Sequence, residues 1–332
     1  MLLRYAHARD LPPAWDGLAG TCFRTRAFLG HTERHNPCGQ RYWALWEHDQ
    51  LVAGAIAYDL RLDLLTFAKI RSPLPMTVLG VPCSVAWPGL LGDRARWPVM
   101  LEALLPQERG LVLGLNTTAP VTTADLIQGD TLPTAVLEHH FDSFDAYLGA
   151  LRSDYRRRHR RIAAALRNTR TTTGPCSELS EPGYQLYVGA YERSDAKLEL
   201  LSHSFLAQLP EPFQLTRLVR DGAQLGWHIS AVEPDRTTFF MGGVDQTRNE
   251  HHKTYFNLLF DVIATGIRAG SPVIDLGQTA EVPKLRTGAR LRQRLMWAWH
   301  RRPIVRRGLR RGAPLLTYGA RFDTPRVFKG RP

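Results

Sequence analysis

The sequence predicts an α/β or α+β protein with two domains. A length of 332 residues favours two domains over one. Apolar runs typical of strands and of helices follow one another in the first part of the chain, and the pattern changes near residue 140. Hydrophobic residues make up 44% of the chain and charged residues 22%. This balance supports a sizeable core and excludes a disordered chain.

The first part of the chain contains short apolar segments separated by turn and proline signals. Residues 42–58, YWALWEHDQLVAGAIAY, predict two strands joined by a tight turn at His48, Asp49 and Gln50. Prolines in the following region confine any strand to a short piece. We expect further strands at 64–70, 76–81, 110–115 and 131–137 and a helix at 93–105.

A long basic helix opens the second part. Residues 144–168 have apolar side chains at helical spacing, and Asp142 and Ser143 are suitable N-terminal caps. The opposite face of this helix is rich in arginine. The elements expected after it are helices at 184–193 and 200–208, a three-strand meander at 213–220, 223–233 and 236–245, a helix at 253–269, and strands at 272–276 and 291–299.

The net charge of +12 and the pI of about 10.0 favour a polyanionic partner, although an arginine-rich composition alone can produce both. The four cysteines form no CxxC pair, which predicts reduced thiols and no zinc or disulfide framework. No apolar run has the length of a transmembrane helix, and the N-terminal stretch lacks a signal-peptide core. We therefore expect a cytoplasmic protein without a metal site.

Three stretches in the second part carry a family resemblance. They are YLGALRSDYRRRHRRI, then MGGVD with NLLFDVIATGIRAG and SPVIDLG, and finally VPKLRTGARL. Their order resembles the second half of the FemAB-like, Fem-type acyltransferases of the GNAT superfamily. The resemblance implies two tandem GNAT-like domains, at 1–140 and 141–300, with a basic tail at 301–332. Each domain would hold a mixed, largely antiparallel sheet flanked by helices, and a cleft would lie between them.

The same resemblance implies transfer of an acyl or aminoacyl group to an amine without metal, ATP or another cofactor. Fem-type enzymes take the aminoacyl group from aminoacyl-tRNA, whereas ordinary GNAT enzymes use acetyl-CoA. We expect an aminoacyl-tRNA donor and, as acceptor, an amine of a small peptide-like or cell-wall precursor. An acyl-CoA-dependent N-acyltransferase is the alternative within this class. A non-catalytic module that binds nucleic acid or anionic lipid is the alternative outside it.

Amide formation requires stabilisation of a developing oxyanion. Lys284 matches the lysine of the family motif and is the candidate for this role; otherwise it is a surface lysine. Asp275 lies at the carboxyl end of the short strand VIDLG, where it can accept the amine proton, orient Lys284, or simply cap a turn. Gln278 and Glu281 lie between the two in sequence and are either polar lining residues or parts of a turn.

Tyr255 and Asn257 open the helix that follows MGGVD and are candidate substrate contacts. GNAT enzymes that use acetyl-CoA carry a glycine-rich loop here that cradles pyrophosphate, but this sequence has no glycine between Gly243 and Gly266. This absence weakens the acetyl-CoA prediction. Arg286 is a candidate phosphate ligand, and Trp227 lines either the core or the cleft.

Two basic surfaces are candidate nucleic-acid contacts that would hold a tRNA backbone without reading its sequence. The alternative for each arginine is a solvated helix face. The tail is also a candidate for peripheral contact with an anionic membrane, with a thin apolar side of Ile304, Val305 and Leu309. The candidate nucleic-acid ligands are Arg157, Arg158, Arg161, Arg302, Arg306 and Arg307.

Overall fold

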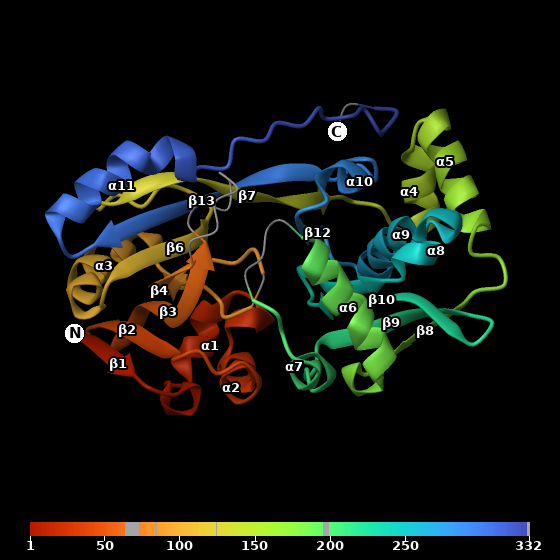
Figure 1. The fold of residues 1–332 in the computed structure, drawn as a ribbon. Coiled ribbons are helices and arrows are strands. Elements are labelled where there is room, and N and C mark those ends of the chain that lie inside the picture. Colours follow the sequence, from red (N-terminus) through yellow and green to blue (C-terminus); the bar gives the residue numbers. More distant parts are fainter. Residues whose placement is uncertain (64–72, 84, 124, 195–198, 331–332) are drawn as a thin grey trace. The chain divides into compact units, whose positions relative to one another are not determined.

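The computed structural model describes residues 1–63, 73–83, 85–123, 125–194 and 199–330. The strand predicted at 64–70 lies outside these residues. The chain divides into two compact units (Figure 1), unit 1 with Met1–Pro133 and Gln293–Ala320, and unit 2 with Thr134–Arg292 and Arg321–Pro332. These units differ from the domain ranges expected from the sequence, 1–140, 141–300 and 301–332. Each unit includes a segment from the C-terminal part of the chain.

Unit 1 is built around an antiparallel meander. Strand β1 pairs with β2, β2 with β3 and β3 with β4, all antiparallel, and β4 pairs in parallel with β6. The elements are β1 (Leu2–Tyr5), α1 (Ala14–Ala19), α2 (Arg26–His35), β2 (Arg41–Glu47), β3 (Gln50–Asp63), β4 (Pro73–Leu79), β5 (Leu90–Gly92), α3 (Trp97–Leu104), β6 (Leu111–Thr117) and α11 (Pro303–Leu316).

Unit 2 repeats this order. Strands β8, β9, β10 and β11 pair successively as antiparallel neighbours, and β11 pairs in parallel with β12. In both units a strand, two helices and a three-strand meander come first, and the parallel strand comes after α3 in unit 1 and after α8 and α9 in unit 2. The elements are α4 (Phe144–Ala150), α5 (Ser153–Ala164), β8 (Arg170–Gly174), α6 (Glu181–Arg193), α7 (His203–Ala207), β9 (Phe213–Arg220), β10 (Ala223–Val232), β11 (Arg236–Val244), α8 (Gln246–His252), α9 (Thr254–Arg268), β12 (Val273–Gln278) and α10 (Glu281–Leu285).

Two long strands carry residues of both units. Strand β7 (Ile127–Glu138) follows β6 in the chain, but its second half pairs with β12 of unit 2. Strand β13 (Arg290–His300) follows β12, but its second half pairs with β6 of unit 1. Each sheet is thus completed by a strand from the other half of the sequence, and the duplicated mixed sheets confirm the predicted α/β fold class.

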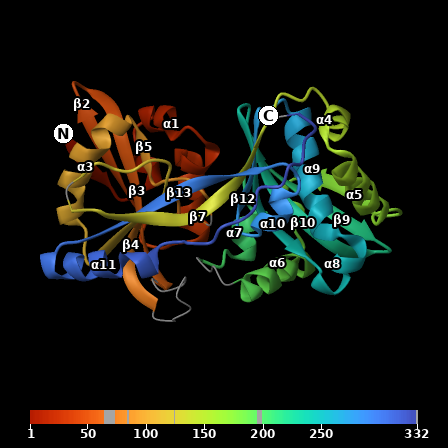
Figure 2. The same cartoon turned by 90° about the horizontal axis from the view of Figure 1, so that it is seen from above.

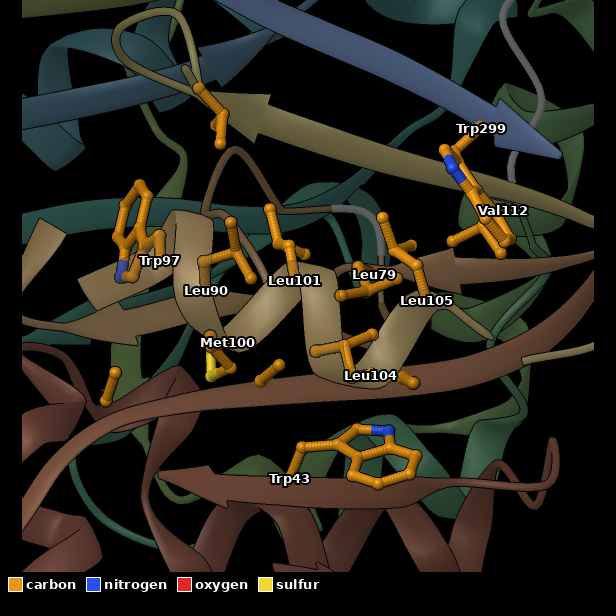
Figure 3. Close-up of a cluster of buried hydrophobic side chains, with 14 of the residues drawn as sticks. Trp43, Leu79, Leu90, Trp97, Met100, Leu101, Leu104, Leu105, Val112 and Trp299 are labelled. Atoms are coloured by element: carbon orange, nitrogen blue, oxygen red, sulfur yellow. The ribbon is translucent and has the colours of Figure 1, made fainter. Parts of the chain in front are cut away.

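The core of unit 1 forms where α3 packs on the sheet. Figure 3 shows Met100, Leu101 and Leu104 of this helix gathered with Trp43 and Trp299, in a cluster whose members are all nearly inaccessible to solvent. Trp299 belongs to β13, so the exchanged strand is part of this core. Burial of apolar surface on this scale is the main stabilising contribution to the unit.

The sheet of unit 2 is covered by α6 on one face and α9 on the other. Successive residues of β10 point to opposite faces: Trp227 donates its indole N–H to the carbonyl of Gly183 in α6, whereas His228 hydrogen-bonds to Asp261 in α9. Helix α6 approaches β11 closely at Gly243. A Cβ added at this position would lie 2.8 Å from the Cβ of Leu186, so a side chain here would clash with α6. Helices α4 and α5 lie beside α9 (Figures 1 and 2).

Several local predictions differ from the structure. The long helix predicted at 144–168 is two helices, because Leu151 is extended and forms a β-bridge with Phe328, while the N–H of Arg152 bonds to the Val327 carbonyl. Ser143 caps α4 as predicted. The helix predicted at 253–269 is likewise preceded by α8, with a left-handed Lys253 between them. Several elements were not predicted: β1, α1, α2, β5, β8, α8, α10 and α11.

Within the described residues, no helix combines the length and apolar character needed to span a bilayer.

Candidate functional site

Strands β11 and β12 of unit 2 pair over a short parallel ladder that ends at one residue, Asp275. The three matched pairs are Arg236 with Val273, Thr237 with Ile274 and Thr238 with Asp275. The ladder between β12 and β7 also loses its register between Asp275 and Gln278. The main-chain groups between Asp275 and Gln278 are therefore outside regular sheet pairing, and this position in an α/β sheet commonly carries chemistry.

Asp275 fixes the turn that follows β12. Its carboxylate is buried; one oxygen, Oδ1, accepts hydrogen bonds from the hydroxyl of Thr134 at 2.6 Å and from the main-chain N–H of Gly277 at 2.9 Å. The other oxygen lies 3.5 Å from the guanidinium of Arg236. Asp275 is thus surrounded by donors, and its bond to the N–H of Gly277 anchors the main chain at that residue.

The turn itself has an uncommon backbone. Gly277 has a φ of 76°, and the non-glycine residues Thr279 and Ala280 have φ values of 61° and 48°. Such values are rare for a β-branched residue and have an energetic cost, so neighbouring groups must hold them in place. The turn directs the carbonyl groups of Gly277 and Gln278 toward a single side chain, that of Lys284.

Lys284 is a buried lysine whose ammonium is held by main-chain oxygens. It lies in α10 and is 3% exposed, and its Nζ donates to the carbonyls of Gly277 at 3.0 Å and Gln278 at 2.7 Å. Burial lowers the pKa of Lys284 to about 8, while the charges of Asp275 and Glu281 oppose this shift. An ammonium has three N–H donors, and the described residues offer no acceptor to the third.

The charge of Glu281 acts on both this lysine and Tyr255. Burial raises the pKa of the Tyr255 phenol, and the negative charge of Glu281 raises it further. Glu281 is the first residue of α10 and also favours the charged form of Lys284. The structure therefore brings together Asp275, Gln278, Glu281, Lys284 and Tyr255 from the predicted set.

An arginine cluster lies on the same unit. Burial lowers the pKa of Arg158 in α5, and the guanidinium of Arg286, directly after α10, and that of Arg161 lower it further. Arg158 also lies over the ring of Phe256, 4.9 Å from its centre. Among the described residues, no carboxylate lies within ion-pair distance of Arg158, Arg161 or Arg286. Three cations without a counter-ion form a site suited to an anion such as phosphate.

Other candidates lie elsewhere. Trp227 is fully buried against α6, so its indole is part of the core. The side-chain amide of Asn257 donates to the carbonyls of Ile162, His252 and Lys253 and ties α9 to α5. Arg157 is exposed on α5. The remaining candidates are on α11 of unit 1, where Arg302 and Arg307 are exposed and Arg306 bonds to Asp125.

Three residues of interest in unit 2 have no sequence signal that predicts their role. Thr134 and Phe256 contact Asp275 and Arg158 only through the tertiary fold. Glu199 has two buried carboxylate oxygens without a hydrogen-bond partner among the described residues, and burial raises its pKa to about 8. A charged residue on a short connection between two helices carries no sequence signal for such burial.

Comparison with known proteins places the fold. No protein-family profile matches the sequence, and no curated protein matches it. In its duplicated sheets and exchanged strands the chain has a tandem GNAT-type fold. The crystal structure of FemX aligns over 90% of this chain and 96% of its own, with 11% identity and a TM-score of 0.55. The tandem GNAT protein from the clavulanic acid biosynthesis pathway aligns over 91% and 99%, with 12% identity and a TM-score of 0.51. These likenesses confirm the predicted FemAB-like, GNAT-superfamily fold.

Proposed function

We propose that this protein is an acyltransferase that forms an amide bond, with the Lys284 ammonium stabilising the acyl oxygen as charge develops on it. The observation that carries this proposal is a buried ammonium at the end of the β11–β12 ladder. Main-chain carbonyls hold two of its N–H groups, and no acceptor for the third is found among the described residues. A fixed cation in a site shielded from water stabilises an oxyanion far more than it would in bulk water.

The choice of lysine supports this role. The chain has only five lysines among its 43 lysines and arginines, and one of the five is this buried residue. An ammonium is a compact charge that fits between the two carbonyls of a turn, whereas a guanidinium is a planar fork. In the proposed step the neutral amine attacks the acyl carbon, a C–N bond forms and the C–O bond of the donor ester breaks. The amine proton passes to the leaving oxygen, so Asp275, already bonded to donors, positions the turn and takes no proton.

We propose aminoacyl-tRNA as the donor, and an amine of a small peptide-like or cell-wall precursor as the acceptor. Two features support the donor. Arg158, Arg161 and Arg286 provide an anion site beside α10. At the start of α9, the N–H of Tyr255 is occupied by the side chain of Asn249, and α8 takes the place of a glycine-rich loop. The occupied N–H of Tyr255 and the presence of α8 both disfavour pyrophosphate binding at the start of α9.

An acyl-CoA donor is the second candidate. The observation in its favour is the similar tandem GNAT protein, whose structure is described as lacking AcCoA. CoA would then have to bind away from the start of α9, for example at the corresponding helix of unit 1.

The test is mass spectrometry of products formed by the full-length protein from a panel of charged tRNAs, acyl-CoAs and small peptide amines. We expect an amide product from charged tRNA that disappears after ribonuclease treatment and in Lys284→Met, but persists in the matched exposed-lysine variant Lys253→Met. Product from acyl-CoA alone would select the second donor. If tRNA binds but none of the donors gives product, the protein is a binding module and the proposal is wrong.

A further inference from the structure

Helix α11 presents an exposed isoleucine among arginines. Ile304 is 78% exposed, the highest exposed fraction among the large hydrophobic residues of the described chain. At helical spacing, Arg307 and Arg311 lie on the same face as Ile304, and both are exposed. Arg301 and Arg302, just before the helix, are exposed as well. A lone exposed isoleucine needs no explanation, but one centred in a dense positive patch is unusual.

The opposite face of α11 is fixed to unit 1. Leu309 packs against the cluster that contains Tyr58, Met76 and Leu111. The guanidinium of Arg306 donates to the carbonyl of His300 and to Asp125, and it lies over the ring of Trp299. These contacts hold the helix on unit 1, and the face with Ile304 is exposed to solvent.

The charge of the outward face is almost uncompensated. Asp125 is the carboxylate that reaches this helix; it lies 2.9 Å from Arg306, and 3.9 Å from Arg310, which is itself 65% exposed. Among the described residues, no acidic group lies within ion-pair distance of Arg301, Arg302, Arg307 or Arg311. The face therefore complements a negatively charged surface.

We propose that the face formed by Arg301, Arg302, Ile304, Arg307 and Arg311, here called the α11 face, docks on an anionic lipid surface. A phosphate backbone of nucleic acid would satisfy the arginines but would gain nothing from Ile304. A bilayer satisfies both, since lipid phosphates pair with the guanidinium groups and the isoleucine enters the acyl boundary. The proposal assigns tRNA contact to the arginine cluster of unit 2, and it holds whether or not the chain has acyltransferase activity.

The test is co-sedimentation of the full-length protein with vesicles of phosphatidylglycerol and phosphatidylcholine, and with pure phosphatidylcholine vesicles. We expect binding to the mixed vesicles only. Arg307→Gln with Arg311→Gln should weaken binding by on the order of twentyfold, at about fivefold for each arginine. Ile304→Ser should also weaken it severalfold, as one apolar side chain is removed from the lipid.

The matched control removes the same charge elsewhere: Arg157→Gln with Arg160→Gln, both exposed on α5, should leave vesicle binding unchanged. All altered positions are exposed, and equal melting temperatures will show that folding is unaffected. Two results would overturn the proposal. One is vesicle binding that the control pair weakens as much as the α11 pair. The other is binding that is insensitive to Ile304→Ser and abolished equally by competing tRNA, which would indicate a surface for any polyanion.

Discussion

The Nζ atom of Lys284 lies 2.7 Å from the main-chain oxygen of Gln278, six residues earlier in the chain. The side chain thus reaches back across the turn that precedes its own helix. The turn contains left-handed Thr279 and Ala280, so it needs a partner to hold it, and the ammonium needs oxygens to compensate its burial. Lysine and turn stabilise each other, so a change in either one should disturb the other.

The stability of the protein should rise with pH where the folded and unfolded forms of Lys284 differ in charge. The unfolded chain keeps this proton up to its ordinary pKa of 10.5, whereas the folded protein loses it near 8. Between these values the unfolded state binds more protons, so the free energy of unfolding increases with pH. Over this pH range the free energy of unfolding of the native protein should increase by about 3 kcal/mol more than that of Lys284→Met. Urea unfolding of both proteins from pH 7 to 10.5 measures it; a constant difference would contradict a lowered pKa.

Gly277→Ala should disturb the lysine through its backbone. An added Cβ would lie 3.4 Å from the nearest atom, so space is adequate and the cost of about 1 kcal/mol comes from the φ of 76°. Gly222→Ala is the matched control, since its φ is 75° and nothing lies within 4 Å. Both variants should lose similar stability in urea unfolding, but only Gly277→Ala should lose acyl transfer. Equal loss of activity would show that the turn has no special role.

Glu199→Gln should stabilise the protein at neutral and alkaline pH. The folded protein keeps the Glu199 proton up to pH about 8, whereas the unfolded chain releases it near its ordinary value of 4.5. Stability therefore falls as pH rises between these values, and glutamine avoids that loss. Thermal unfolding at pH 5 and pH 8 should show a larger benefit at pH 8. Glu192→Gln, on the exposed side of α6, should show none. A destabilised Glu199→Gln at pH 8 would mean that the carboxylate has a partner.

Arg286→Gln should weaken tRNA binding and its dependence on salt. The charge of Arg286 helps to lower the pKa of Arg158, so the two guanidinium groups lie near each other, and an anion bound by both would release counter-ions from its own surface. We expect the slope of the logarithm of affinity against the logarithm of salt concentration to decrease in magnitude by about 1. Fluorescence anisotropy with labelled tRNA measures the slope. Arg167→Gln, an exposed arginine beyond the end of α5, is the control; an equal change there would argue against a localised site.

Elements with strong local signals were predictable. The hairpin of β2 and β3 turns at His48 and Asp49, both left-handed, as the sequence around them suggests. The meander of unit 2 and the helices α3, α6 and α9 lie where apolar spacing predicts them. Lys284 and Asp275 emerged from a motif, and the structure brings them into one turn.

Features that depend on distant residues were not predictable. The break between α4 and α5 is made by main-chain bonds from Val327 and Phe328, which lie more than a hundred residues away in sequence. The exchange of β7 and β13 could not be predicted, because the sequence does not show which sheet each strand joins. The two similar sheets offer similar edges to both strands. The sequence leaves open whether Trp227 lines the core or a cleft, because aromatic residues line both; burial of Trp227 and its hydrogen bond to Gly183 place it in the core.

The most direct test of the account is the single-turnover rate of acyl transfer from charged tRNA, compared between the native protein and Lys284→Met across pH 6 to 10. Removal of one oxyanion-stabilising donor should slow the chemical step by about 10²–10³-fold with tRNA affinity unchanged. The native rate should also decline above pH about 8, as the ammonium loses its proton. An unchanged rate in Lys284→Met would contradict the assignment of this lysine to the reaction.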